Sequence, residues 1–475
     1  MLQTLRNAWK TVDIRKKLIY TLIILLLYRI GTVIPVPFVD ASAFTASFGG
    51  TILDYLNTLS GGSLQVATLF ALGISPYITA SIVVQLLTVA IPALERWAQE
   101  GEEGKKKINN LTRYTTVILA VVTAIGYYFL MKNNGMIATS GQTVLGAFVI
   151  IVCYCAGASL VMWLGEKINE YGIGNGISII LFANIISGLP AKILRLVELC
   201  IQGFDGNTPA LWGTLSLVFA LGYLALLVAM VVFCVYVTGS ERRISVQYAK
   251  RVVGRKMYGG QSQNLPLKLN MAGVMPVIFA SSIISLPATI MAFCGVATPS
   301  SWEKASGFWE SFNFLMKSDG WIYPILLFVL IIAFSYFYIQ ISFNPVEVSN
   351  NLKKNGGTIL GCRPGQPTTD YIRKSLSKVT LIGAFFLSII AIIPIILVPL
   401  VMEPLVEAVL SNHATYATYF GNATYAETAR NLVTHFTSSF AFGGTSLLIV
   451  VGVALELVRD LEAQLSMRSY KGFLN

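Results

Sequence analysis

Residues that could carry catalysis are scarce in this chain of 475 residues. It has two histidines, His413 and His435, and neither belongs to an HExxH zinc motif. Its cysteines lie in or beside apolar stretches, without the spacing of a zinc site or a disulfide framework. They are Cys153, Cys155, Cys200, Cys234, Cys294 and Cys362. This placement favours small buried thiols, so neither a metal nor a cofactor is expected.

Other chemical signatures are also missing. The chain has no GxSxG nucleophile motif and no GxxxxGK[ST] phosphate loop. The glycine-rich stretch Gly172–Gly176 opens an apolar run instead of following a strand, which favours close helix packing or a kink. A proton or ion relay needs ionisable groups in the middle of spanning segments. Apart from Arg29, the middles of the predicted spans carry none. An intramembrane enzyme therefore lacks its catalytic groups, and a secondary transporter with inverted repeats remains the alternative function.

The composition defines the class of protein. Hydrophobic residues make up 55% of the chain and charged residues 12%, with a mean hydropathy of +0.68. A soluble protein of this length needs about twice that share of charge to cover its surface. Disorder is excluded because apolar residues dominate. The sequence therefore predicts an integral membrane protein.

Ten apolar stretches are candidates for membrane spans of about 20 residues each. They are residues 18–34, 66–90, 114–131, 143–164, 173–189, 211–237, 271–293, 321–343, 379–402 and 436–458. If loops alternate sides, those on the side of both termini carry 27 Lys and Arg, and the opposite loops carry 6. This asymmetry predicts that both termini lie in the cytoplasm. The first stretch leads into Pro35 without a small-residue cleavage site, which indicates a retained span.

Two of the expected cytoplasmic loops, residues 238–270 and 344–378, are long and basic. Orientation signals and attraction to anionic lipid are one interpretation. A docking surface for a cytosolic partner or ribosomal RNA is the other. About 30 residues exceed what joining two helices requires, which favours docking.

A short segment between the first two spans has helical spacing of Ile52, Leu56 and Leu59 and a glycine pair on each side. At about ten residues it is too short to span. A surface amphipathic turn and a re-entrant helix on glycine hinges both fit it. The following span carries a polar edge at Ser75, Thr79, Ser81 and Gln85, which is typical of a helix that faces other helices or a wet cavity.

At these residues the chain resembles the SecY family, the protein-conducting channel subunits of the Sec translocon. Matching motifs follow one another in order over nearly the whole chain. They are Phe70–Ile78, Leu164–Glu166, Tyr171–Ser178, Leu265–Lys268, Asn270–Pro276, Phe279–Ser282, Phe343–Pro345, Asn351–Lys354, Arg363–Gly365 and Phe442–Val450. The pattern is similar to that of bacterial members.

The resemblance implies an all-α polytopic membrane protein, with ten transmembrane helices in two pseudosymmetric halves around a central hourglass pore. Spans 1–5 form the half at residues 1–190, and spans 6–10 form the half at 191–475. The family's pore ring maps onto Ile74, Ile78, Ile177, Leu181, Ile278 and Ile449. The first four form two i,i+4 pairs, so each pair lies on one helix face. Leu181 replaces the commoner isoleucine, a change that conserves volume.

The short segment corresponds, by the same resemblance, to the family's plug, at about residues 51–64. Its residues include Thr51, Ile52, Leu53, Leu56 and Leu59. The lateral gate is expected between spans 2–3 and 7–8. Polar gate positions there match Gln85, Asn175, Ser281 and Ser282. A hydrogen-bonded seam of this kind is worth about 0.6–2 kcal/mol per contact, which is weak enough for a hydrophobic signal helix to displace.

The two basic loops resemble the family's docking surface for the SecA motor ATPase and the ribosome, and the expected contact residues are Arg243, Lys250, Arg255 and Arg363. Further implied partners are the small membrane subunits SecE and SecG, signal peptides, nascent chains and membrane lipid. The implied location is the inner (cytoplasmic) cell membrane, and the implied role is non-enzymatic. The external loop at residues 403–430 departs from the family pattern, and no physical account explains it.

Overall fold

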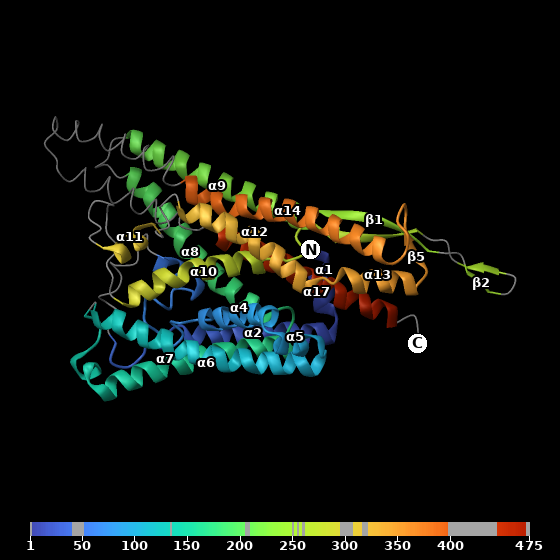
Figure 1. Cartoon of the computed structure of the whole chain (residues 1–475). Helices are drawn as coiled ribbons and strands as arrows, with labels where there is room; N and C mark the ends of the chain where they lie inside the picture. Colours follow the sequence, from blue (N-terminus) through green and yellow to red (C-terminus); the bar gives the residue numbers. More distant parts are fainter. Residues whose placement is uncertain are drawn as a thin grey trace.

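The computed structural model is a bundle of long helices with a small β-structure at one end (Figure 1). It describes residues 2–39, 52–133, 135–204, 210–248, 251–253, 256–258, 262–294, 307–315, 322–397 and 444–471. The predicted external loop at 403–430 lies outside these residues. The strands, α13 and the C-terminal end of α17 lie at the right of Figure 1, and α11 lies at the opposite end.

The first part of the chain forms helices that pack as neighbours. They are α1 (Leu2–Lys10), α2 (Val12–Gly31), α3 (Ile52–Leu59), α4 (Ser75–Ala90), α5 (Pro92–Gln99), α6 (Glu102–Asn133), α7 (Val144–Tyr171) and α8 (Gly176–Phe204), with the 3₁₀ turn η2 (Thr139–Gln142) before α7. Contacts join α4 to α6, α6 to α7, α7 to α8 and α2 to α7. These helices therefore form one packed unit.

The second part repeats this plan. Its helices are α9 (Ala210–Gly239), α10 (Met275–Phe293), α11 (Phe308–Leu315), α12 (Ile322–Ser342), α13 (Pro345–Lys354), α14 (Gln366–Leu397) and α17 (Gly444–Lys471). Contacts join α10 to α12, α12 to α14, α14 to α17 and α9 to α14. The two units meet where α8 contacts α9 and α17, and where α10 contacts α3, α4 and α6.

Each of the ten predicted spans overlaps one long helix: α2, α4, α6, α7, α8, α9, α10, α12, α14 and α17. By length and hydropathy, four helices of the described chain are able to cross a membrane, and a fifth candidate is the pair α4–α5, which is bent by 106°. The number of ten spans therefore stays a prediction, although the helices stand where the apolar pattern puts them.

Several boundaries differ from the predicted ones. Residues 66–74 are apolar but form turns, and α4 begins only at Ser75. Gly73 has a positive φ of 54°, which ends any helix arriving from before, and Pro76 is suited to the first helical turn. The short helix is likewise confined to Ile52–Leu59, because Gly61 and Gly62 both have positive φ values. In the other direction, α8 and α14 extend past the predicted spans into stretches expected to be loops.

The two basic loops form one structure. Strand β1 (Glu241–Tyr248) pairs antiparallel with β4 (Ser262–Lys268) on one side and with β5 (Gly357–Ile359) from the other loop on its second side. A separate hairpin joins β2 (Arg251–Val253) to β3 (Lys256–Tyr258). A small apolar core beneath the larger sheet includes Ile244, Leu267, Ile359 and Ile372. We call the three-stranded sheet β4–β1–β5, with the two loops that it joins, the β-platform. Because its apolar face is buried in this way, the β-platform presents an ordered surface.

Candidate functional site

Five of the six predicted ring residues are buried in the largest apolar cluster of the described residues, and the sixth, Ile177, packs against it half-buried. The side chains come from four places in the fold. Ile74 and Ile78 lie at the start of α4, Ile177 and Leu181 on α8, Ile278 on α10 and Ile449 on α17. Residues separated by up to 375 positions are therefore brought into one buried apolar cluster to which both units of the bundle contribute.

The short helix α3 lies against this cluster. Leu59, its last residue, is buried and belongs to the same cluster as the ring residues, and α3 contacts both α8 and α10. Leu56 is half-buried and lines a cavity. Ile52 and Leu53 belong to the helix, whereas Thr51 lies outside the described residues. A surface turn, one of the two predicted possibilities, does not fit a helix packed in this way.

The segment that follows α3 is tied to the first unit by its backbone. Tyr127 on α6 donates a hydrogen bond of 2.5 Å to the carbonyl oxygen of Leu64. Tyr154 on α7 donates one of 3.2 Å to the carbonyl oxygen of Ala67. Both tyrosines are buried, so these bonds are shielded from water. The segment between α3 and α4 is therefore a fixed support, and the chain enters it from α3 through Gly61 and Gly62, both of positive φ.

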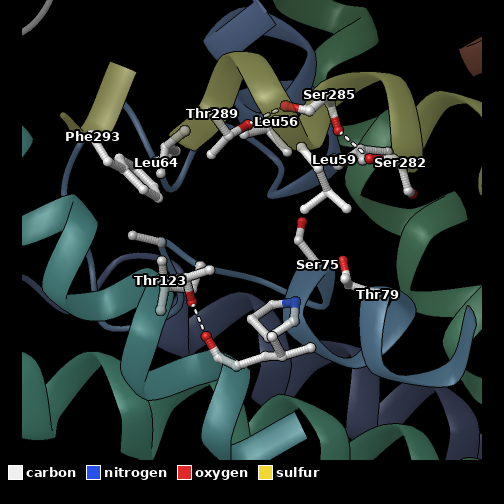
Figure 2. A pocket seen from close by; sticks show the side chains of 15 residues that line it. Leu56, Leu59, Leu64, Ser75, Thr79, Thr123, Ser282, Ser285, Thr289 and Phe293 are labelled. Carbon is white, nitrogen blue, oxygen red and sulfur yellow. Dashed lines mark hydrogen bonds between the residues drawn. The ribbon is translucent and has the colours of Figure 1, made fainter. Parts of the chain in front are cut away.

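A cavity lies beside α3, between α4 and α6 on one side and α10 on the other (Figure 2). About 90 Å³ of it is open to the centres of water-sized molecules. Its apolar lining carries six hydroxyl side chains: Ser75, Thr79, Thr123, Ser282, Ser285 and Thr289. The sequence predicted a polar edge on α4 but missed Thr123, Ser285 and Thr289. The signal was present on α10, where Ser282, Ser285 and Thr289 recur at spacings of three and four residues.

Three of the six cavity hydroxyls donate to carbonyl oxygens of their own helices. The Ser285 hydroxyl donates to the carbonyl oxygen of Ser282 at 2.8 Å, and the Thr289 hydroxyl donates to that of Ser285 at 2.6 Å. The Thr123 hydroxyl donates to the carbonyl oxygen of Leu119 at 2.8 Å. Such local bonds satisfy a hydroxyl when no partner is present and exchange at low cost when another helix arrives. The cavity walls are therefore adaptable.

The four predicted gate residues have the following places. Ser282 lines the cavity, and Ser281 is buried beside it on α10, with its hydroxyl donating to the carbonyl oxygen of Val277 at 2.8 Å. Gln85 donates through Nε2 to the hydroxyl of Ser81, 3.2 Å away on its own helix. The Oδ1 atom of Asn175 accepts from the backbone N–H of Ile177 at 3.1 Å, just before α8. The structure therefore brings Ser282 alone of the four to the cavity, and gives Ser281, Gln85 and Asn175 local partners.

Two of the four predicted docking residues fall on the β-platform. Arg243 lies on β1, exposed, with its Nε 2.7 Å from Oε1 of Glu241. Arg363 follows β5 and is exposed. Lys250 and Arg255 lie outside the described residues. Because β1 and β5 are paired, the loops that carry Arg243 and Arg363 belong to one surface.

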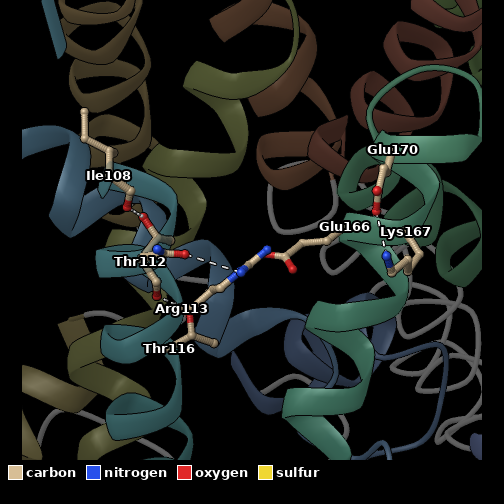
Figure 3. Close-up of polar contacts among 8 residues, drawn as sticks. Ile108, Thr112, Arg113, Thr116, Glu166, Lys167 and Glu170 are labelled. Carbon is tan, nitrogen blue, oxygen red and sulfur yellow. Dashed lines mark hydrogen bonds and ion pairs between the residues drawn. The ribbon is translucent and has the colours of Figure 1, made fainter. Parts of the chain in front are cut away.

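A separate ion pair joins α6 to α7. Arg113 Nε lies 2.7 Å from Oε1 of Glu166, and the guanidinium also reaches Asn110 (Figure 3). Both side chains retain access to solvent, so the pair contributes about 1 kcal/mol or less. No cluster of three His, Cys, Asp or Glu that could hold a metal occurs in the described chain. The contact is therefore a structural tie within the first unit.

This arrangement defines a class: a polytopic helical membrane protein with an apolar cluster shared by two units, a short helix packed on it and a cavity at its side. The SecY family profile matches residues 68–458. The Protein translocase subunit SecY of Streptomyces galbus is 40% identical over 487 aligned residues, which cover 100% of both chains. The chain therefore belongs to the SecY family.

Solved structures agree on the fold. The structure described as "The structure of a protein conducting channel" superposes with a TM-score of 0.58 at 18% identity, covering 94% of this chain and 92% of that one. The structure described by its plug domain, which "stablizes the closed state of the translocation channel", gives 0.54 at 18% identity and the same coverage. Canine Sec61 in a ribosome–channel complex gives 0.54, again at 18% identity and 94% and 92% coverage.

Proposed function

We infer that this chain is the protein-conducting channel of a Sec translocon. It passes unfolded preproteins across the cytoplasmic membrane and releases transmembrane helices sideways into lipid. The observation that carries this function is the single buried cluster that unites Ile78, Leu181, Ile278 and Ile449 with Leu59 of α3. The translocase relatives support it, and they are named as translocase subunits, not as enzymes.

The chemistry of the constriction suits this task. An apolar ring offers no hydrogen bonds to replace an ion's hydration shell, and a narrow apolar passage resists wetting. The same side chains deform around a passing polypeptide without binding any particular residue of it. Such a ring excludes ions because it excludes water, and it makes no specific contact with a passing polypeptide. It therefore conducts chains of any sequence while the membrane stays sealed to ions.

In this proposal α3 is the plug. Leu59 closes the ring from one side, and Gly61 and Gly62 form the hinge about which the helix swings away. The solved relative whose plug domain stabilises the closed state supports this assignment. In this proposal the arrangement in which Leu59 shares one buried cluster with the ring residues is the closed channel.

The lateral gate is the seam between α4 and α6 on one side and α10 and α12 on the other. Gln85, Ser281 and Ser282 act there as polar gate residues, together with the hydroxyls of the cavity. Asn175, the fourth predicted gate residue, stands just before α8, whose principal neighbours among the described helices are α3, α7, α9 and α17 and not the helices of this seam. A signal helix that enters between α4 and α10 finds apolar walls and hydroxyls that exchange partners readily. In this proposal residues 1–190 and 191–475 move apart as two halves during this opening.

Both termini and the β-platform face the cytoplasm, as the positive-inside rule requires. The platform, with Arg243, Lys250, Arg255 and Arg363, binds SecA or the ribosome, which supply the energy that this chain does not generate. The ribosome-bound canine Sec61 relative supports the second partner. SecE, SecG, signal peptides, nascent chains and lipid complete the set of contacts.

Reconstitution tests this function. Vesicles that contain this chain with SecE and SecG are supplied with SecA, ATP and a radiolabelled preprotein, and protease protection of the preprotein is measured. We expect protection that depends on this chain and on a functional signal sequence. Equal protection in vesicles without the chain, or protection that is indifferent to the signal, would overturn the assignment.

A further inference from the structure

Asn184 is a buried polar residue in the largely apolar first half of α8, and its side chain joins three elements. Its Nδ2 donates a 2.7 Å hydrogen bond to the carbonyl oxygen of Leu59, at the end of α3. The same nitrogen donates a 2.9 Å bond to the hydroxyl of Tyr28 on α2. A carbonyl oxygen only accepts, so Nδ2 must face α3. The amide therefore bridges α2, α8 and the short helix.

The bond to Leu59 meets a requirement of helix ends. The last carbonyl groups of a helix lack partners within it, and a buried one is costly to leave unpaired. Gly61, two residues further along the chain, lies against Asn184 and Arg29. Its carbonyl oxygen lies 3.4 Å from Nη1 of Arg29, and a β-carbon at this position would come within 2.9 Å of Oδ1 of Asn184. The end of α3 is therefore gripped through its backbone.

Asn184 also stands on the helix face that carries part of the ring. Ile177, Leu181 and Asn184 are spaced by four and three residues, which places them on one side of α8. A movement of α8 that widens the ring therefore also draws the amide of Asn184 away from Leu59. The geometry couples the width of the constriction to the hold on the short helix.

The other atom of the Asn184 amide group destabilises the fold. Oδ1 of Asn184 is buried and has no hydrogen-bond partner. An unpaired buried acceptor destabilises the fold, and a leucine of similar size would avoid that penalty. The residue therefore lowers overall stability while it holds one particular arrangement of α3. Tyr28 supports it from α2, where its ring is stacked on Phe70 with the centroids 5.4 Å apart.

We propose that Asn184 is a positioning residue that latches α3 in the closed channel and releases it when α8 moves. The proposal rests on the proposed function, because it assigns α3 as the plug. The latch differs from the fixed ties at Tyr127 and Tyr154, which hold the support and stay in place when the plug leaves. It acts on backbone groups, so it is independent of the plug's side chains.

The test compares Asn184→Leu and Tyr28→Phe with the parent chain in two assays. One is ion conductance of the resting channel in planar bilayers, and the other is export of a preprotein whose signal sequence is defective. Asn184→Leu should raise the resting conductance about fivefold, the effect of one lost hydrogen bond, and should increase export of the defective preprotein. Tyr28→Phe keeps the bond to Leu59 and should give a smaller rise in both.

Ser187→Ala is the matched control, because its hydroxyl donates only within α8, to the carbonyl oxygen of Asn184 at 2.7 Å. It should behave like the parent. A residue needed only for folding would lower export of every preprotein and leave conductance low, and that result for Asn184→Leu would overturn the latch. Parental conductance in Asn184→Leu and Asn184→Ala, in channels that still export a normal preprotein, would also overturn it while leaving the proposed function intact. Asn184→Ala serves as the second variant if Asn184→Leu does not assemble.

Discussion

Ile78 on α4 and Ile278 on α10 hold equivalent positions in two copies of one local structure. Each is the fourth residue of its helix and lies two residues after a proline. Each also follows a glycine of positive φ five residues earlier, Gly73 at 54° and Gly273 at 64°. Both side chains are buried in the same apolar cluster. The two units of the bundle therefore deliver an isoleucine to this cluster by the same means.

The equivalence extends to close packing behind these segments. A β-carbon on Gly157 of α7 would stand 2.0 Å from the carbonyl oxygen of Leu69, and one on Gly383 of α14 would stand 2.1 Å from that of Leu269. Only a glycine allows the helix to approach the backbone this closely. The segment that precedes each of the two isoleucines therefore packs directly against a glycine of a neighbouring helix.

This packing gives a stability prediction. Gly157→Ala should destabilise the protein by about 1–3 kcal/mol, because α7 must move away from the segment before α4. The measurement is thermal unfolding in lipid nanodiscs. Gly188→Ala on α8 is the control, since its added β-carbon meets nothing within 4 Å, and it should leave the melting temperature equal or slightly higher. Equal melting temperatures for Gly157→Ala and the parent would contradict the packing.

The plug assignment predicts the effect of a deletion. A chain without residues 51–60 should still translocate preproteins but leak ions at rest, because Leu59 no longer fills the space among the ring residues. Conductance in planar bilayers measures the leak, and preprotein protection in the same preparation shows that the channel is assembled. A resting conductance equal to that of the parent would argue against α3 as the plug.

The cavity at the gate predicts the effect of filling it. Ser285→Leu should stabilise the closed gate by occupying the cavity between α4, α6 and α10, so that signal sequences must be more hydrophobic to be inserted. Insertion is measured for a series of model helices of increasing leucine content. Ser285→Ala removes the hydroxyl without filling the space and should keep the parental threshold. The gate assignment fails if the leucine variant has that threshold too.

The β-platform predicts the effect of reversing a charge. Arg363→Glu should reduce SecA-driven export while assembly of the channel in the membrane is unchanged, because the residue is exposed on the proposed docking surface. The control is Lys132→Glu, which reverses an exposed charge in the last turn of α6, outside the β-platform. This variant should export preproteins normally. Wild-type export by the Arg363 variant would refute its docking role.

Much of this fold could be predicted from the sequence because apolar runs locate helices in a membrane protein. The i,i+4 spacing of Ile74 and Ile78 also predicted one shared helix face, and the structure buries both in one cluster. The rest depends on contacts that no local pattern encodes. The pairing of β1 with β5 joins two loops about 110 residues apart, and Asn184 is a single amide whose partners come from α2 and α3.

Crosslinking of a stalled preprotein tests the central claim most directly. In a variant without the six native cysteines, one cysteine is placed at Ile78 or Ile278 in the constriction, or at Ile290 on the exposed face of α10. A preprotein that carries a cysteine probe in its translocating segment should crosslink to positions 78 and 278 and not to 290. Crosslinking at position 290 alone, or at none of the three while translocation proceeds, would contradict passage through the apolar constriction.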